Sequence, residues 1–184
     1  MEIHLIRHTK VKLTDNVCYG QSDVELSPTF LQDISAVQLD TDYNAVYTSP
    51  LKRCTQLAAY FNFESIKEDR IQELNFGDWE MQQWEAIPKA EITPWYNDYL
   101  NVAPPNGENV ITFRQRVLAF WEELVQKHEN EKVLMITHSG VIRIILQYVF
   151  DFPLENMFIF QPQFGKKVIL RFHASHWNLT SFNA

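Results

Sequence analysis

The chain of 184 residues is 46% hydrophobic and 14% aromatic, and its formal net charge at pH 7 is -7. This length and composition suit one compact α/β domain with a substantial core, covering residues 1–184. The negative charge and the lack of a Lys/Arg cluster argue against nucleic acid as a partner. No apolar run is long enough to span a membrane, and the first residues do not resemble a signal peptide, so we expect a cytoplasmic protein with no membrane partner.

The first third of the chain predicts strands and helices in alternation. Apolar runs bounded by polar turns indicate strands, and Ser-Pro pairs at 27–28 and 49–50 are typical of helix starts. In order, we predict a strand at 2–7, a loop at 9–25, a helix at 29–37, a strand at 44–49 and a helix at 51–61.

The rest of the chain continues this alternation after an aromatic-rich interruption. Four prolines break residues 78–105, so we expect short helices forming a lid or side subdomain at about 78–109. Afterwards we predict a helix at 108–129, a buried strand at 132–137, a helix at 140–150, and late strands at 157–160, 166–172 and 177–182. The expected fold is a three-layer α/β/α arrangement around a mainly parallel, mixed sheet, whose late edge strands can pair across a homodimer.

Four polar residues fall at the ends of these predicted elements. Arg7 and His8 end the first strand, Arg53 begins the helix after the second strand, and His138 ends the strand at 132–137. Ligands of open α/β sheets bind beyond the carboxyl ends of the strands, so three segments point at one crevice. Two arginines match phosphate oxygens, and the nearby helix starts add free N–H groups. The sequence therefore predicts a phosphate pocket that needs neither metal nor cofactor.

The histidines of this pocket suit phosphoryl transfer. A neutral imidazole can attack phosphorus, and we assign that role to His8. His138 would donate a hydrogen bond to the equatorial oxygens of the transferring group. The leaving oxygen needs a proton from the far side of phosphorus, and Glu73, on a loop beside Gly77, is the candidate acid.

Four ordered motifs resemble the histidine phosphatase superfamily, which has a phosphoglycerate-mutase-like fold. They read LIRHT at 5–9, TSPLKR at 48–53, ELNFGDWE at 73–80 and THSGVIR at 137–143. The resemblance implies that Arg7, His8, Arg53 and His138 form the phosphate pocket, that His8 is phosphorylated, and that Glu73 is the acid and base. These roles coincide with those argued above from chemistry.

Three positions depart from the usual family pattern. Thr9 and Ser139 stand where glycine is frequent, as does Met81 after the third motif, and none of the three removes a catalytic side chain. The stretch NVCYGQSDV at 16–24, following RHT, resembles the alpha-ribazole phosphatase branch, which acts in assembly of the cobalamin nucleotide loop.

That branch resemblance implies a set of substrate contacts. Leaving-group selectivity would depend on the loop at 9–25 and on the predicted lid. The residues expected to line the substrate side are Thr9, Tyr19, Gly20, Gln21 and Ser139, with Asn106 and Glu108 helping to close the pocket. Arg143, by itself, can be read as a helix-surface cation, and Cys18 as a loop thiol near the site.

Other phosphate chemistries fit the sequence poorly. Cys18 and Cys54 are expected to be free thiols, and a cysteine phosphatase needs an arginine six positions after its nucleophile, where Val24 and Tyr60 stand instead. An aspartyl-phosphate mechanism starting from the acidic residues at 40–42 has little weight, because they do not end an apolar strand. No glycine loop of the P-loop type is present.

We therefore expect a phosphomonoesterase that acts on a small-molecule phosphomonoester through phosphohistidine, with alpha-ribazole 5′-phosphate as the leading substrate. A broad-specificity acid phosphatase and a phosphoglycerate-mutase-type phosphotransferase remain alternatives, although the short chain favours hydrolysis over the mutase. A non-catalytic phospholigand-binding module ranks last, because His8 and Glu73 are both present.

Overall fold

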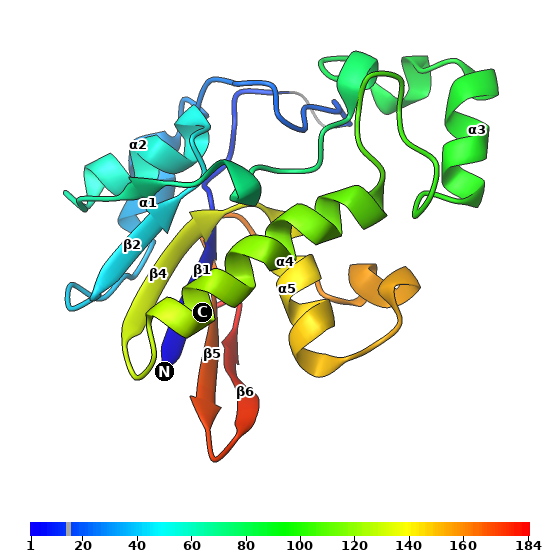
Figure 1. Ribbon diagram of the computed structural model, residues 1–184. Coiled ribbons are helices and arrows are strands. Elements are labelled where there is room, and N and C mark those ends of the chain that lie inside the picture. The colour runs from blue at the N-terminus through cyan, green and yellow to red at the C-terminus, as the bar shows by residue number, and fades with distance from the viewer. Residues whose placement is uncertain (14–15) are drawn as a thin grey trace.

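A six-stranded mixed sheet forms the centre of the computed structural model, which describes residues 1–13 and 16–184 (Figure 1). Its order is β3-β2-β4-β1-β5-β6, and the first four strands run parallel while β5 and β6 pair antiparallel. The strands are β1 (Glu2–Arg7), β2 (Ala45–Thr48), β3 (Ile66–Lys67), β4 (Lys132–Thr137), β5 (Lys167–His173) and β6 (His176–Phe182). The predicted loop at 9–25 is irregular where described, and residues 14–15 of it lie outside the described residues.

Helices cover both faces of this sheet, which confirms the three-layer α/β/α arrangement (Figure 1). The α-helices are α1 (Phe30–Ser35), α2 (Lys52–Tyr60), α3 (Lys89–Asn97), α4 (Val110–Lys127) and α5 (Ser139–Phe150). Short 3-10 helices follow at η1 (Asp69–Ile71), η2 (Gly77–Trp79), η3 (Trp84–Ala86) and η4 (Leu154–Ile159). None of the described helices is both long and apolar enough to cross a membrane.

Alternating side chains of the central strands supply both cores. In β1, Ile3 and Leu5 pack with α4 and α5, whereas Ile6 packs with α1 and α2. In β4 the same alternation sends Val133 and Met135 to the first core and its other two apolar residues to the second. Because both faces are covered, a central strand must be apolar throughout, which is why β4 reads as an unbroken apolar run.

Two sequence predictions about element boundaries are wrong. The predicted strand at 157–160 lies largely within the 3-10 helix η4, where Met157 is buried while Phe158 and Ile159 are 45% and 64% exposed. These neighbouring exposed side chains do not alternate as those of a half-buried strand would. The helix starts also lie later than the Ser-Pro pairs suggest, because the N-caps are Thr29 and Leu51.

The segment at 78–109 contains η3 and α3 and lies away from the sheet, beyond the N-terminal end of α4 (Figure 1). Its apolar residues pack around a small separate cluster made of Cys18, Trp79, Ile87 and Ile92. The helix α3 continues through Pro94 instead of stopping there. At the other end of the molecule, β6 is an edge of the sheet, and its pairing across a homodimer stays a prediction.

Gly77 joins this segment to the rest of the structure at a position that only glycine fits. Its φ is +53°, and an added Cβ would overlap the carbonyl oxygen of Pro105. Gly165 has a similar φ of +67°, but there the nearest atom is a side-chain methyl carbon of Val37 at 3.1 Å. We expect Gly77→Ala to lower the free energy of unfolding by about 1–3 kcal/mol, because backbone cannot yield as a methyl can.

Gly165→Ala is the matched control, since it carries the positive-φ strain without the backbone overlap. Urea unfolding of both variants beside the wild type measures the difference. If both variants lower the free energy of unfolding equally, the overlap with the carbonyl of Pro105 does not destabilise Gly77→Ala.

Candidate active site

The parallel pairing of β1 with β4 brings the two predicted site histidines together. Arg7 pairs with Thr137 in the register, so the next residue of each strand emerges at the same edge. The amide of His8 donates to the carbonyl of Thr137 at 3.0 Å, and the rings of His8 and His138 lie 5.2 Å apart between centroids. The structure thus places two motifs, 130 residues apart in the chain, side by side.

His8 is held as a neutral imidazole in one tautomer. Its Nδ1 lies 2.7 Å from the carbonyl oxygen of Thr9, and a carbonyl can only accept, so Nδ1 carries the proton. Burial, reinforced by the charges of Arg53 and Arg7, lowers the pKa of His8 well below its usual value. The lone pair therefore sits on Nε2, which is the form that can attack phosphorus.

His138 adopts the opposite tautomer. Arg53 donates from Nε to Nδ1 of His138 at 3.3 Å, so the single proton of the neutral ring is on Nε2, 2.8 Å from Oγ of Ser49. Burial and then Arg53 lower the pKa of His138 well below its usual value. A hydrogen bond from Nδ1 to a phosphoryl oxygen would therefore require uptake of a second proton, which a bound dianion favours. Ser49 orients this ring and does not cap a helix.

Arg53 is fully buried, yet among the described residues no carboxylate forms an ion pair with it. Its terminal nitrogens donate to the carbonyl oxygens of Ser22 at 2.8 Å and Gly20 at 2.5 Å. Its guanidinium carbon lies 5.2 Å from the ring centre of Tyr19. Neutral partners position this charge without cancelling it, so it remains available to an anion.

Arg7 is also positioned by neutral groups. It donates to the carbonyl oxygen of Pro162 at 2.9 Å, and its guanidinium carbon lies 3.5 Å from the ring centre of Phe164. Its buried Nε has no hydrogen-bond partner among the described residues. The same Phe164 ring lies 5.5 Å from that of His8, so it packs against both site residues. None of the sequence motifs includes Phe164, and the only signal beside it in the sequence is Gly165. In the structure, the amide of Gly165 donates to the carbonyls of Arg7 and His8.

Glu73 lies at the N-terminal end of α5. Its Oε2 accepts from the amide of Gly140 at 3.2 Å, and its Oε1 accepts from the amide of Leu74 at 3.1 Å. An added Cβ at Gly140 would overlap Oε1, so this close approach requires glycine. The start of α5 is thus occupied by a carboxylate of the protein. The start of α2 is too, because the amide of Lys52 donates to Asp23 at 2.8 Å, so one predicted free N–H group at each helix start is already engaged.

A cavity of about 380 Å³ is lined by charged residues, among them Arg7, Glu73 and Arg143, and by aromatic rings. His8, Arg53 and His138 are buried and are not among its lining residues. Trp84 and Trp95 stack there, with ring centres 5.8 Å apart at an interplanar angle of 27°. Two polar atoms of the cavity wall, Nε1 of Trp95 and Oγ of Ser139, are buried without a hydrogen-bond partner among the described residues. Such a wall suits a phosphate ester whose leaving group is large and planar.

The remaining sequence-predicted residues divide into those that line this cavity and those that do not. Tyr19, Gly20 and Ser139 line it, as do Cys18 and Arg143, so the reading of Arg143 as a surface cation is wrong. Cys18 is a protonated thiol, because burial and the charge of Glu80 raise its pKa to about 12.

Four predicted substrate contacts lie outside the cavity wall. The side chain of Thr9 borders a different cavity, beside α1. Gln21 donates to the carbonyl of Glu73 at 3.0 Å, and Asn106 donates to Asp78 at 2.8 Å. Glu108 bonds Arg116. The side chains of Gln21, Asn106 and Glu108 thus bind neighbouring groups of the protein, whereas the buried hydroxyl of Thr9 has no hydrogen-bond partner among the described residues.

Glu80, which the sequence analysis left without a role, organises the loop at 20–22. Its carboxylate accepts from the amides of Gln21 at 2.8 Å, Ser22 at 2.6 Å and Phe76 at 3.0 Å. An added Cβ at Gly20 would overlap this carboxylate. The final glutamate of ELNFGDWE was the available signal, although sequence alone does not show that it binds a loop more than fifty residues away.

One group of described residues has the spacing of metal ligands, and it lies at the opposite end of β1 from His8. It consists of Glu2, His4 and Asp40. Arg171 binds Glu2, and Lys132 binds Asp40 at 2.7 Å, so these carboxylates are already paired with cations. The group is part of a surface ion network and is separate from the candidate active site.

Comparisons with known proteins show the family of this chain. The family model for the histidine phosphatase superfamily (branch 1) matches residues 3–184. The adenosylcobalamin/alpha-ribazole phosphatase of Escherichia coli (strain K12) is 26% identical over 176 residues, which are 90% of this chain and 87% of that protein. Phosphoserine phosphatase 1 of Hydrogenobacter thermophilus is 31% identical over 119 residues, covering 61% of this chain and 54% of that protein.

Solved structures show the same fold. The alpha-ribazole phosphatase from Shigella flexneri superposes with a TM-score of 0.90 at 24% identity, covering 100% of this chain and 96% of that chain. This likeness confirms the expected phosphoglycerate-mutase-like architecture. The family model shows more than the fold, because the residues that it matches include all four sequence motifs. The chain therefore belongs to the histidine phosphatase superfamily.

Proposed function

We propose that this protein hydrolyses phosphomonoesters through a phosphohistidine at His8, and that alpha-ribazole 5′-phosphate is its substrate. One observation carries the proposal. His8 is neutral and has its lone pair on Nε2, and it lies near two arginines that no described carboxylate neutralises. Arg7 and Arg53 would hold the phosphate dianion, because a buried cation without a counter-ion is stabilised by a bound anion.

The reaction would run in two displacements at phosphorus. In the first, Nε2 of His8 forms a bond to phosphorus while the ester P–O bond breaks, and Glu73 gives its proton to the departing oxygen. In the second, water attacks phosphorus and the P–N bond breaks. Glu73, now ionised, accepts the proton of that water, and phosphate leaves with His8 neutral again. Family membership supports the phosphatase chemistry, and the residue roles are part of the proposal.

The leaving group is the more specific part of the proposal. Alpha-ribazole carries a planar benzimidazole, which can pack against aromatic rings such as Trp84 and Trp95 and offers a ring nitrogen as acceptor for the free Nε1 of Trp95. Likeness to alpha-ribazole phosphatases at 24–26% identity supports the same choice. A broad-specificity phosphatase and a mutase-type phosphotransferase are the alternatives. The cytoplasmic location expected from the sequence stays a prediction.

His8→Ala should reduce phosphate release to the background rate, because no other group would form the bond to phosphorus. His138→Ala should lower kcat on the order of 10²-fold, the usual cost of losing one stabilising donor. Phosphate release is measured with a chelator present throughout, and we expect the wild-type rate to be unaffected by it. Appreciable turnover by His8→Ala would assign the nucleophile elsewhere.

The pH dependence follows from the lowered pKa of His8. A histidine with its usual pKa near 6.5 would be protonated, and inactive as a nucleophile, below that pH. Because this pKa is lowered in the folded protein, kcat/KM should not show the roughly fivefold fall between pH 6.5 and 5.5 that a pKa of 6.5 would give, and the profile should lean to the acid side. A fall of that size between pH 6.5 and 5.5 would contradict a buried, neutral His8.

Stability must be followed over the same pH range, because the same shift acts on folding. His8 and His138 bind fewer protons folded than unfolded once the pH falls below about 6.5, so the free energy of unfolding should decrease as the pH decreases. Rates are therefore compared only where circular dichroism shows the protein to be folded.

A substrate panel tests the leaving group. It compares alpha-ribazole 5′-phosphate with phosphoserine, 3-phosphoglycerate, sugar phosphates and a phosphotyrosine peptide. We expect kcat/KM to favour the ribazole ester by orders of magnitude. Trp95→Phe, which keeps a ring but removes the indole N–H, should lower kcat/KM about 2- to 10-fold for that ester and leave phosphoserine unchanged. Similar kcat/KM values for all of these esters, with activity still lost in His8→Ala, would support the phosphohistidine mechanism and contradict the proposed substrate.

A further inference from the structure

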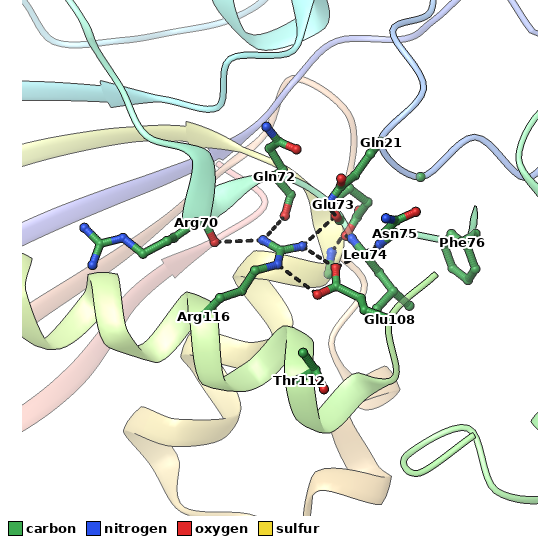
Figure 2. A network of polar contacts seen from close by, with 12 residues as sticks. Gln21, Arg70, Gln72, Glu73, Leu74, Asn75, Phe76, Glu108, Thr112 and Arg116 are labelled. Carbon is green, nitrogen blue, oxygen red and sulfur yellow. Dashed lines mark hydrogen bonds and ion pairs between the residues drawn. The ribbon is translucent and has the colours of Figure 1, made fainter. Parts of the chain in front are cut away.

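Arg116, on α4, binds the backbone on which Glu73 stands (Figure 2). One terminal nitrogen donates to the carbonyl oxygens of Arg70 at 2.8 Å and Gln72 at 2.9 Å, and the other donates to the carbonyl of Glu73 at 2.8 Å. None of the sequence motifs includes Arg116, and it does not line the 380 Å³ cavity. Its hydrogen bonds reach the chain at 70–73, and its guanidinium carbon lies 4.7 Å from the ring centre of Phe113, which lines the cavity.

The guanidinium has no spare donor. Besides the three carbonyls, its Nε donates to Oε2 of Glu108 at 3.0 Å, and its second terminal nitrogen donates to Oε1 of Glu108 at 2.5 Å. These five bonds use all five N–H groups of an arginine. The two side chains are 21% and 13% exposed, so the pair is largely shielded from water. A lysine has three donors on one atom and cannot span these acceptors.

Neighbouring contacts complete the clamp on this stretch. Thr137, at the end of β4, donates from Oγ1 to the carbonyl of Ile71 at 2.8 Å, and Gln21 donates to the carbonyl of Glu73 at 3.0 Å. Glu108 also accepts from the amide of Asn75 at 2.9 Å. Four consecutive carbonyls, from residue 70 to residue 73, are thus bound by protein donors, although the stretch from 73 to 76 is irregular.

We infer that Arg116 is a positioning residue for the general acid, Glu73. The inference rests on the proposed function, in which Glu73 protonates the leaving oxygen. A flexible carboxylate on an irregular loop delivers a proton well only if its backbone is fixed, because general-acid catalysis needs the donor within hydrogen-bond reach of the leaving oxygen. Arg116 fixes that backbone from behind, without contact with substrate.

The leaving group gives a readout that a merely structural role would not move. An ester with a poor leaving group, such as an alkyl phosphate, needs the proton from Glu73, whereas 4-nitrophenyl phosphate departs as a stable anion and needs it little. Loss of Arg116 should therefore lower kcat/KM for the alkyl ester by about 10-fold or more and for the nitrophenyl ester by far less. The ratio of the two values comes from one sample, so it does not depend on the fraction of protein that is folded.

The experiment measures this ratio for the wild type, Arg116→Ala, Arg116→Lys, Glu73→Gln and Arg114→Ala. Arg114 is the matched control, since it lies on the same helix but donates to Gln147 at 2.8 Å and not to the chain at 70–73. We expect both Arg116 variants to shift the ratio toward that of Glu73→Gln, and Arg114→Ala to keep the wild-type ratio. Adding Arg116→Ala to Glu73→Gln should change the ratio no further.

If the Arg116 variants lower kcat/KM equally for both esters, so that the ratio is unchanged, Arg116 does not position Glu73. A ratio shift in Arg114→Ala as large as in Arg116→Ala would overturn the positioning role as well. Failure of the proposed function gives different results, which do not involve the Arg116 variants. If the proposed function is wrong, His8→Ala keeps its activity, or Glu73→Gln has the wild-type ratio of kcat/KM values.

Discussion

The pairing of β1 with β4 is the interaction on which the rest of the site depends. These two strands occupy the middle of the sheet and are buried on both faces, so their register is set by two cores at once. A shift of one residue would exchange the faces of every side chain in the strand, at the cost of both cores. With the register as it is, His8 and His138 emerge together, and the helix after β4 begins beside Glu73. Packing far from the site therefore determines the geometry within it.

The electrostatics of the site follow from how its charges are compensated. Carbonyl oxygens hold Arg7 and Arg53, and burial beside those arginines keeps both histidines neutral. Burying a cation without a counter-ion is costly, and a phosphate dianion removes that cost when it binds. Arg116 shows the opposite arrangement, because Glu108 neutralises it and leaves its remaining donors for structure. Two kinds of arginine thus lie within one small region, one without a carboxylate partner among the described residues and the other paired with a carboxylate.

Different parts of the fold line the cavity. Arg7 ends β1 and Ser139 begins α5 after β4, so the sheet determines their positions. Tyr19 lies on a loop, and rings such as Trp84 and Trp95 pack on their own small cluster. Substitutions in that cluster can change the shape of the aromatic wall without moving His8, because few core contacts connect it with the sheet. The two parts of the cavity wall therefore rest on different core clusters.

Local patterns in the sequence determined much of this protein: the alternation of strands and helices, the three-layer fold, the positions of Arg7, His8, Arg53 and His138 at element ends, and that of Glu73 on a loop. These features depend on a few neighbouring residues, which a sequence displays directly. Other features were decided only by the tertiary structure, among them the tautomers of the two histidines, the role of Glu80, the ring of Phe164 and the clamp made by Arg116. Most of these depend on a partner distant in the chain, which the tertiary structure alone brings into hydrogen-bond range, and the tautomer of His8 depends on a local backbone geometry that the sequence does not display.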